Sequence, residues 1–325
     1  MTTPLAMLDR PAARQWLGLA LAVAGAIFFA TKGIFIKLAL THGIDTLTAL
    51  AWRMLVSVPV FVTLGILSYR RSRAASTEDK PGLNAKLLLQ AAGIGLLNYF
   101  LASYLDFSAL GYITAQLNRL ILLTYPFFVV LLGAVFFRRQ VTPLMILSLA
   151  VSYFGIAMIF LQDFTHGGDN VLLGSALVFG AAVIYAVYQL VAKPLIDRLG
   201  AQLFTSIAMS AAGVAVLVYF AATQPLASLA IDAYGLWLML GLGLLATVVP
   251  AYCISGAIGL IGSERTAVVG NVSPIATVIL AISVLGEMFT IWHAAGTALV
   301  LFGVWLFNRK QKPKATEVEA AKVEP

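Results

Sequence analysis

Long apolar stretches follow one another along the chain, and short polar segments separate them. Crossing a bilayer as a helix takes about 20 apolar residues. Ten stretches reach this length, near 16–40, 46–69, 84–107, 112–137, 142–161, 171–193, 202–221, 234–258, 265–287 and 291–308. None shows the alternation of apolar and polar positions found in strands of membrane barrels. Because backbone within lipid must satisfy its own hydrogen bonds, the pattern predicts an all-α polytopic membrane protein with ten transmembrane helices.

The first apolar run begins after Arg10 and Arg14, where a cleaved signal peptide could also begin. The run continues to Leu40. That is longer than the apolar core of a signal peptide and sufficient to span a bilayer. We therefore expect a cytoplasmic N-terminal segment (1–15) and a first helix that stays in the protein.

The lysines and arginines are distributed unequally between the predicted loops. Four of the 21 lie inside predicted helices, and the others lie in the terminal segments or in loops on the side of the N-terminus. Because cytoplasmic loops are enriched in Lys and Arg, this predicts cytoplasmic termini in a bacterial-type inner membrane. The polar residues 309–325 predict a disordered cytoplasmic tail.

The second half of the chain repeats the pattern of the first. An offset of 148 residues superposes Pro126 on Pro274 and Gly155 on Gly303. The pattern predicts two five-helix repeats, over 16–161 and 171–308. Five helices is an odd number, so the second repeat is expected to be inverted in the membrane. Inverted repeats are typical of secondary transporters, whose solute site lies between the repeats.

Composition agrees with the membrane class and excludes several others. Hydrophobic residues make up 61% of the chain and charged residues 11%, against about 25% charged in soluble domains. The net charge of +7 reflects loop residues facing lipid headgroups, so we expect no nucleic-acid partner. The single cysteine, Cys253, forms no intramolecular disulfide, and no spacing indicates a metal site. No P-loop or catalytic constellation is visible, so we expect neither a cofactor nor an enzyme.

Three features resemble the drug/metabolite transporter superfamily, specifically its EamA-type ten-helix members. They are FFATKGIFIKLA in the first helix, the Pro126/Pro274 pair, and Leu285-Gly286-Glu287 before the last helix. Within the superfamily the chain is most similar to the YddG-like amino-acid exporters. The resemblance implies export of amino acids or similar metabolites through a site between helices 1, 3, 4, 6, 8 and 9.

Charged residues inside the predicted helices are the main candidates for the solute pathway. Such charges are expensive in lipid and therefore usually face a cavity or a partner. Lys32, Arg53 and Arg119 fall outside the bilayer midplane, and Asp106 lies at the outer end of the third helix. They predict an outer vestibule that contacts a solute carboxylate. A purely structural ion-pair network, or snorkelling to the headgroups, is the alternative.

Polar residues near the midplane form a second group of candidates. Tyr99, Ser103 and Asp106 share one helical face, and Tyr185 and Tyr188 share another. Ser273 belongs to a stripe of small residues that helix packing alone would also explain.

The repeated prolines are candidate hinges. Pro126 and Pro274 are each expected mid-helix, where proline removes a helix hydrogen bond. Paired kinks would let the repeats rock, and static bends are the alternative.

Together these features favour a secondary transporter that carries a small solute by alternating access. They do not determine the oligomeric state, for which a monomer is our expectation. Other expectations stay open: export of other metabolites or drugs, a channel-like facilitator, and a membrane enzyme acting on a lipid-linked substrate. A channel would need a continuous polar filter, and none is visible. An enzyme would need paired acid and base groups, and Asp106 with Lys32 is the one candidate pair.

Overall fold

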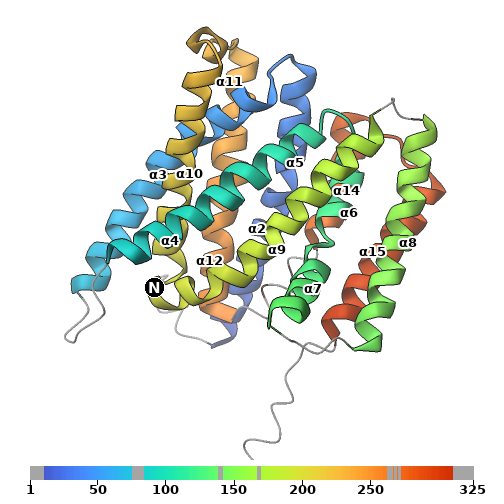
Figure 1. Ribbon diagram of the computed structural model, residues 1–325, viewed down its shortest axis with the longest axis horizontal. Helices are drawn as coiled ribbons and strands as arrows, with labels where there is room; N and C mark the ends of the chain where they lie inside the picture. The colour runs from blue at the N-terminus through green and yellow to red at the C-terminus, as the bar shows by residue number, and fades with distance from the viewer. Residues whose placement is uncertain are drawn as a thin grey trace, which may run out of the picture.

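The computed structural model describes residues 11–74, 84–137, 142–166, 170–261, 266, 269 and 272–309. Every element within these residues is a helix (Figure 1). In chain order the elements are α2 (Pro11–Thr41), α3 (Thr46–Ala74), α4 (Ala85–Gly95), η1 (Leu96–Ala102), α5 (Ser103–Ala109), α6 (Ala115–Leu122), α7 (Tyr125–Phe137), α8 (Pro143–His166), α9 (Val171–Leu199), α10 (Ala201–Thr223), η2 (Leu226–Leu229), α11 (Ala233–Leu240), η3 (Gly241–Val248), α12 (Val249–Ile261), α14 (Val272–Leu285) and α15 (Ile291–Arg309). Most of the predicted N-terminal segment and of the predicted disordered tail lies outside the described residues.

The helices confirm a polytopic membrane protein. Within the described residues, eight helical stretches are long and apolar enough to cross a membrane, and they coincide with the first eight predicted spans. The last two predicted spans correspond to the shorter apolar helices Val272–Leu285 and Ile291–Phe307. Ten transmembrane helices therefore remain a prediction.

The fourth predicted span is interrupted between α6 and α7, and the interruption comes before its proline. α6 ends at Leu122, and Thr124 donates its hydroxyl to the Ile121 carbonyl at 2.7 Å before α7 begins. Pro126 is the second residue of α7, in the first turn, where its missing N–H has no intrahelical partner to lose. The expectation that Pro126 lies mid-helix was therefore wrong. Pro274 lies within α14, and a hinge role for either proline stays a prediction.

Two spans contain wider π-helical stretches. The third span runs through η1 and the eighth through η3, each continuous with α-helix on both sides. Such stretches are rare and often accompany functional sites. Tyr99 of η1 and Thr247 of η3 both line the cavity described below.

The two halves of the chain pack on each other in matching pairs. α2 packs against η3, α12 and α14, while α9 packs against η1, α5, α6 and α7. α3 packs along α10, and α8 packs along α15. Exchanging each helix of one half for the equivalent helix of the other half leaves this pattern of neighbours unchanged.

Glycines bring α8 and α15 into backbone contact, and the two helices run side by side (Figure 1). A Cβ on Gly155 would lie 2.6 Å from the Gly296 carbonyl oxygen, and a Cβ on Gly296 would lie 2.6 Å from the Gly155 carbonyl oxygen. Small residues at such positions are typical of membrane helix pairs, which gain stability from close packing rather than from excluding water.

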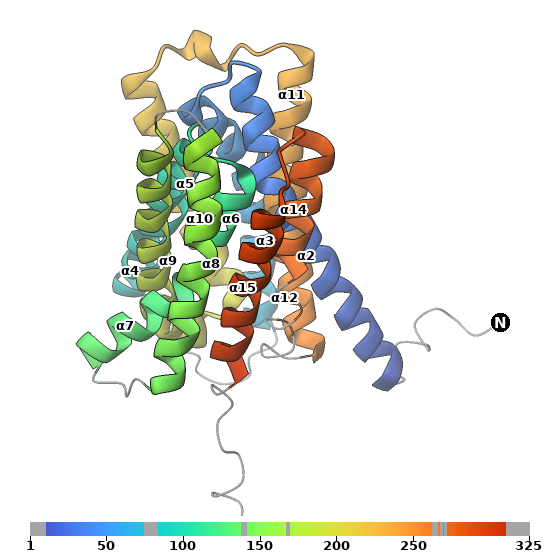
Figure 2. The ribbon, with the colours of Figure 1, turned by 90° about the vertical axis from the view of Figure 1, so that its right-hand side faces the viewer.

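The bundle has two distinct ends. α2 begins and α15 ends at one of them, here called the terminal end (Figure 2). The α10–α11 connection, which contains η2, lies at the opposite one, here called the far end. On the outside of the bundle, large apolar side chains such as Phe136 of α7 and Trp237 of α11 are each 73% exposed. A surface of this kind suits lipid rather than water.

Candidate functional site

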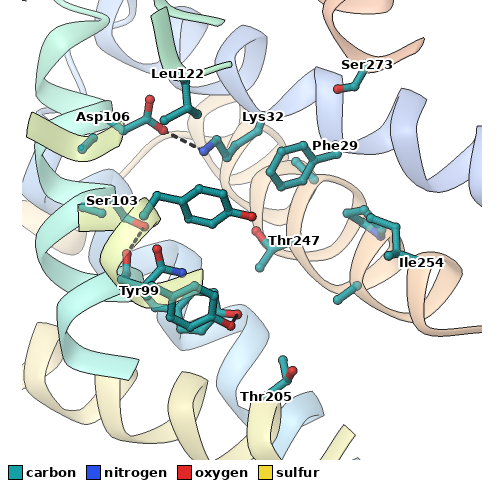
Figure 3. A pocket seen from close by; sticks show the side chains of 18 of the residues that line it. Phe29, Lys32, Tyr99, Ser103, Asp106, Leu122, Thr205, Thr247, Ile254 and Ser273 are labelled. Atoms are coloured by element: carbon teal, nitrogen blue, oxygen red, sulfur yellow. Dashed lines mark hydrogen bonds and ion pairs between the residues drawn. The ribbon is translucent and has the colours of Figure 1, made fainter. Parts of the chain in front are cut away.

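A cavity of about 490 Å³ lies between the two halves of the chain (Figure 3). All eight predicted pathway residues line it: Lys32, Tyr99, Ser103, Asp106, Arg119, Tyr185, Tyr188 and Ser273. α3 and α10 also contribute to the wall, although the family resemblance did not include their spans. The structure thus brings the candidates together, and their roles in transport remain predictions.

Lys32 and Asp106 form an ion pair at the edge of the cavity. The Lys32 ammonium lies 2.7 Å from Asp106 Oδ2, and Figure 3 shows the two groups directed at each other. Asn118 Nδ2 donates to the other carboxylate oxygen at 3.1 Å. The two side chains are 15% and 5% exposed. Because neither lipid nor an apolar core solvates a charge, each charge is stabilised mainly by the other.

Two arginines reach the same cavity without a carboxylate partner among the described residues. Arg53 donates to Ser103 Oγ at 3.1 Å and to Thr247 Oγ1 at 3.3 Å, and it is 5% exposed. Arg119 donates to Ser273 Oγ at 2.8 Å, and its guanidinium carbon lies 4.9 Å from the centre of the Phe29 ring. We refer to Lys32, Arg53, Asp106 and Arg119 as the charged cluster.

Four tyrosines form an aromatic wall beside the charged cluster. Tyr125 meets Tyr185 edge to face at 4.7 Å, Tyr185 stacks on Tyr188 at 5.9 Å, and Tyr188 meets Tyr99 edge to face at 5.8 Å. The hydroxyls of Tyr99 and Tyr188 are hydrogen-bonded at 3.2 Å. Each ring is therefore held by its neighbours, which gives the cavity a fixed aromatic surface.

The cavity extends toward the terminal end of the bundle. Its lining includes Thr205, near the start of α10, and Ile254 of α12, both well separated from Asp106 in Figure 3. Toward the far end, the fully buried Ile36, Leu50 and Phe107 pack into one core. We expected a vestibule open on the far side. The charged cluster lines the cavity beside this core, and an outer vestibule stays a prediction.

An ion pair joins helices beyond the charged cluster, toward the far end. Lys37 Nζ lies 3.4 Å from Glu287 Oε1, and the Glu287 carboxylate accepts from the backbone N–H groups of Ala115 at 2.7 Å and Gln116 at 3.3 Å. A carboxylate is stabilised there because the first N–H groups of α6 have no intrahelical acceptor. One contact thus joins α2, α6 and the segment between α14 and α15.

A second polar network joins α8 to α15. His293 Nε2 lies 3.1 Å from Asp163 Oδ1, and Thr114 donates its hydroxyl to the other Asp163 oxygen at 2.7 Å. Thr290 Oγ1 lies 2.9 Å from His293 Nδ1. Both networks lie toward the far end of the bundle, where they join helices from the two halves of the chain.

Sequence reasoning missed several of these residues. Asn98, Asn118 and Thr247 are buried polar side chains inside apolar spans, which is a usable signal. Lys37 lies in the first-helix motif FFATKGIFIKLA, and Glu287 lies in the Leu285-Gly286-Glu287 motif. Nothing in their spacing along the chain indicated that the two residues are partners. Among the described residues, no group of three or more His, Cys, Asp or Glu side chains could hold a metal ion.

Comparison with known proteins gives a consistent family. The EamA-like transporter family model matches residues 16–161 and 172–309. An uncharacterized transporter of Bacillus subtilis, YcbK, is 27% identical over 290 residues, which cover 86% of this chain and 88% of that protein. An uncharacterized transporter of Synechocystis is 25% identical, covering 87% of this chain and 85% of the relative.

A solved structure supports the fold alone. A protein of known crystal structure superposes with a TM-score of 0.58 at 15% sequence identity. The superposition covers 91% of this chain and 97% of that one.

Proposed function

The chain belongs to the EamA-like transporter family, and from this membership we propose that it exports amino acids or similar small metabolites across a bacterial-type inner membrane by alternating access. The observation that carries the proposal is the cavity of about 490 Å³, which polar and aromatic side chains line and beside which a buried apolar core packs toward the far end. A carrier in one of its two states has a one-sided cavity, whereas an open channel has a continuous path.

The arrangement of helices supports two inverted five-helix repeats. Exchanging the halves preserves which helices are neighbours, and π-helical stretches occur in the third helix of each half. The cavity lies where the halves meet, as expected for a solute site shared by two repeats. In this proposal, the halves rock against each other around the cavity.

Rocking would require the far end to separate. The Lys37–Glu287 pair and the Asp163–His293 contact are polar groups that water can solvate once they part. The buried apolar core around Ile36 and Phe107 would have to open as well. We infer that the described conformation is the one with access from the terminal end.

The transport mode is tested by counterflow in proteoliposomes. With purified protein and a candidate amino acid, uptake should saturate, and preloading with unlabelled solute should cause transient accumulation of labelled solute. The reason is that a carrier reorients between two one-sided states. Protein-free liposomes are the control. Flux that rises linearly with concentration, without counterflow, would instead indicate a channel-like facilitator.

The orientation is tested by cysteine labelling in whole cells. Cys253→Ser removes the single cysteine, and Lys314→Cys or Ala227→Cys then introduces one in the tail or in the exposed η2 segment. Since basic segments stay in the cytoplasm, an impermeant maleimide should label the cysteine at position 227 and leave that at 314 unlabelled until the cells are opened. The reverse labelling would show that the termini are outside.

A further inference from the structure

The charges that line the cavity do not balance. Its lining contains Lys32, Arg53 and Arg119 but a single described carboxylate, Asp106. The other carboxylates in the described residues lie outside the lining: Asp45, Asp163, Asp197, Asp232 and Glu287. The described wall therefore carries two positive charges in excess.

Asp106 is already neutralised. Its carboxylate accepts from the Lys32 ammonium at 2.7 Å and from the Asn118 amide at 3.1 Å. A solute ammonium would have to compete with Lys32 for this group. Within the described lining, a zwitterionic amino acid thus meets no free carboxylate for its positive end.

Unlike Asp106, the two arginines have no oppositely charged group within hydrogen-bond distance among the described residues. Their side-chain acceptors are the neutral hydroxyls of Ser103, Thr247 and Ser273. Arg119 Nε is buried and has no hydrogen-bond partner among the described residues. Hydroxyls satisfy the directions of hydrogen bonds but carry no opposite charge, and one carboxylate that is already paired with Lys32 does not balance two guanidiniums, which is costly within a membrane. A guanidinium presents its donors in a planar fork that fits a carboxylate or a phosphate.

The aromatic wall indicates which chemistry suits the uncharged part of the solute. Tyr99, Tyr125, Tyr185 and Tyr188 line the same cavity as the arginines. Their rings offer apolar surface on which a flat or aliphatic body can pack. The cavity is therefore cationic on one side and aromatic on the other.

We propose that the solute is an amphiphilic organic anion, whose carboxylate or phosphate meets Arg53 and Arg119 while its apolar body packs on the tyrosines. The inference rests on the proposed transporter function and deepens it, because it selects net-negative metabolites over the zwitterionic amino acids of the same shape. An inside-negative membrane potential drives an anion outward, so the potential adds to the driving force for export of this solute.

The test uses ligands that share a phenyl body and differ in charge: 3-phenylpropionate, phenyl phosphate, phenylalanine and 3-phenylpropylamine. Binding is measured by intrinsic fluorescence in detergent, and counterflow is measured in proteoliposomes. At least one anion should bind at least about tenfold more tightly than phenylalanine, and the amine should bind weakest. The two anions distinguish carboxylate from phosphate as the recognised group.

Variants link this selectivity to the arginines. Arg53→Gln and Arg119→Gln should each weaken anion binding at least about tenfold and change phenylalanine binding little. Lys86→Gln, which removes the same charge from an exposed position on α4, should leave both unchanged. Arg119→Lys keeps the charge and should retain part of the affinity, which provides a second comparison if a glutamine variant does not fold.

The outcomes separate this inference from the proposed function. Counterflow of phenylalanine without binding of either anion overturns the anion inference and leaves the carrier function intact. Selective anion binding with channel-like flux supports the inference and overturns the carrier function. Binding of none of the four probes overturns the inference, because two guanidiniums without carboxylate partners would then attract no amphiphilic anion.

Discussion

Replacing Asp106 with asparagine should destabilise the folded protein by about 3 kcal/mol, because the Lys32 ammonium is then left buried without a counter-ion. The parent pair is 2.7 Å apart, and the Asp106 side chain is 5% exposed. Removing both charges with Lys32→Met and Asp106→Leu should recover most of the loss, since a buried pair is often replaced by apolar side chains at little cost. The measurement is the free energy of unfolding of each variant in detergent.

Two comparisons make this result interpretable. Asp197→Asn removes an exposed carboxylate from α9 and should change stability by less than about 1 kcal/mol. Transport per folded molecule distinguishes a structural pair from a pathway pair, because only the latter changes KM when the protein remains folded. Parental stability and transport in Asp106→Asn would show that the pair is neither necessary scaffold nor pathway.

The location of the cavity could be predicted from the sequence because one physical rule governs it. Charges and clustered tyrosines within apolar spans must find partners or water, and in a helical bundle both are found between helices. Lys32, Arg119 and Tyr185 were selected on this ground, and all three line the cavity. The rule gives no direction, so the side from which a solute reaches the cavity stays a prediction.

The breaks within spans could not be predicted in the same way. Pro126 indicated an interruption of the fourth span, but the helix had already ended at Leu122. The π-helical stretches η1 and η3 carry no proline or other residue that predicts a wider turn, so the extra residue per turn is set by tertiary packing. Likewise, the partnership of Lys37 and Glu287 depends on the packing of helices far apart in the chain.

Glycines also show that the sequence alone does not reveal which positions are closely packed. Gly93 and Gly95 are equivalent in the sequence, two residues apart on one apolar helix. In the structure, a Cβ on Gly95 would lie 2.6 Å from the Cα of Ala208 in α10, whereas a Cβ on Gly93 would have no neighbour within 4 Å. Only the packing of α4 on α10 tells the two apart.

Gly95→Ala should therefore destabilise the protein by about 1–3 kcal/mol, because backbone atoms cannot move aside as a flexible side chain can. Gly93→Ala should instead stabilise it by about 0.5–1 kcal/mol, since alanine loses less conformational freedom on forming a helix. Unfolding free energies of both variants in detergent provide the measurement, and each serves as the control for the other. Gly95 also lies one helical turn before Tyr99, so pushing α4 away from α10 should disturb the Tyr99–Tyr188 hydrogen bond and weaken solute binding. Equal stability of the two variants would mean that α4 and α10 do not pack backbone to backbone, and that this part of the cavity wall is held by other contacts.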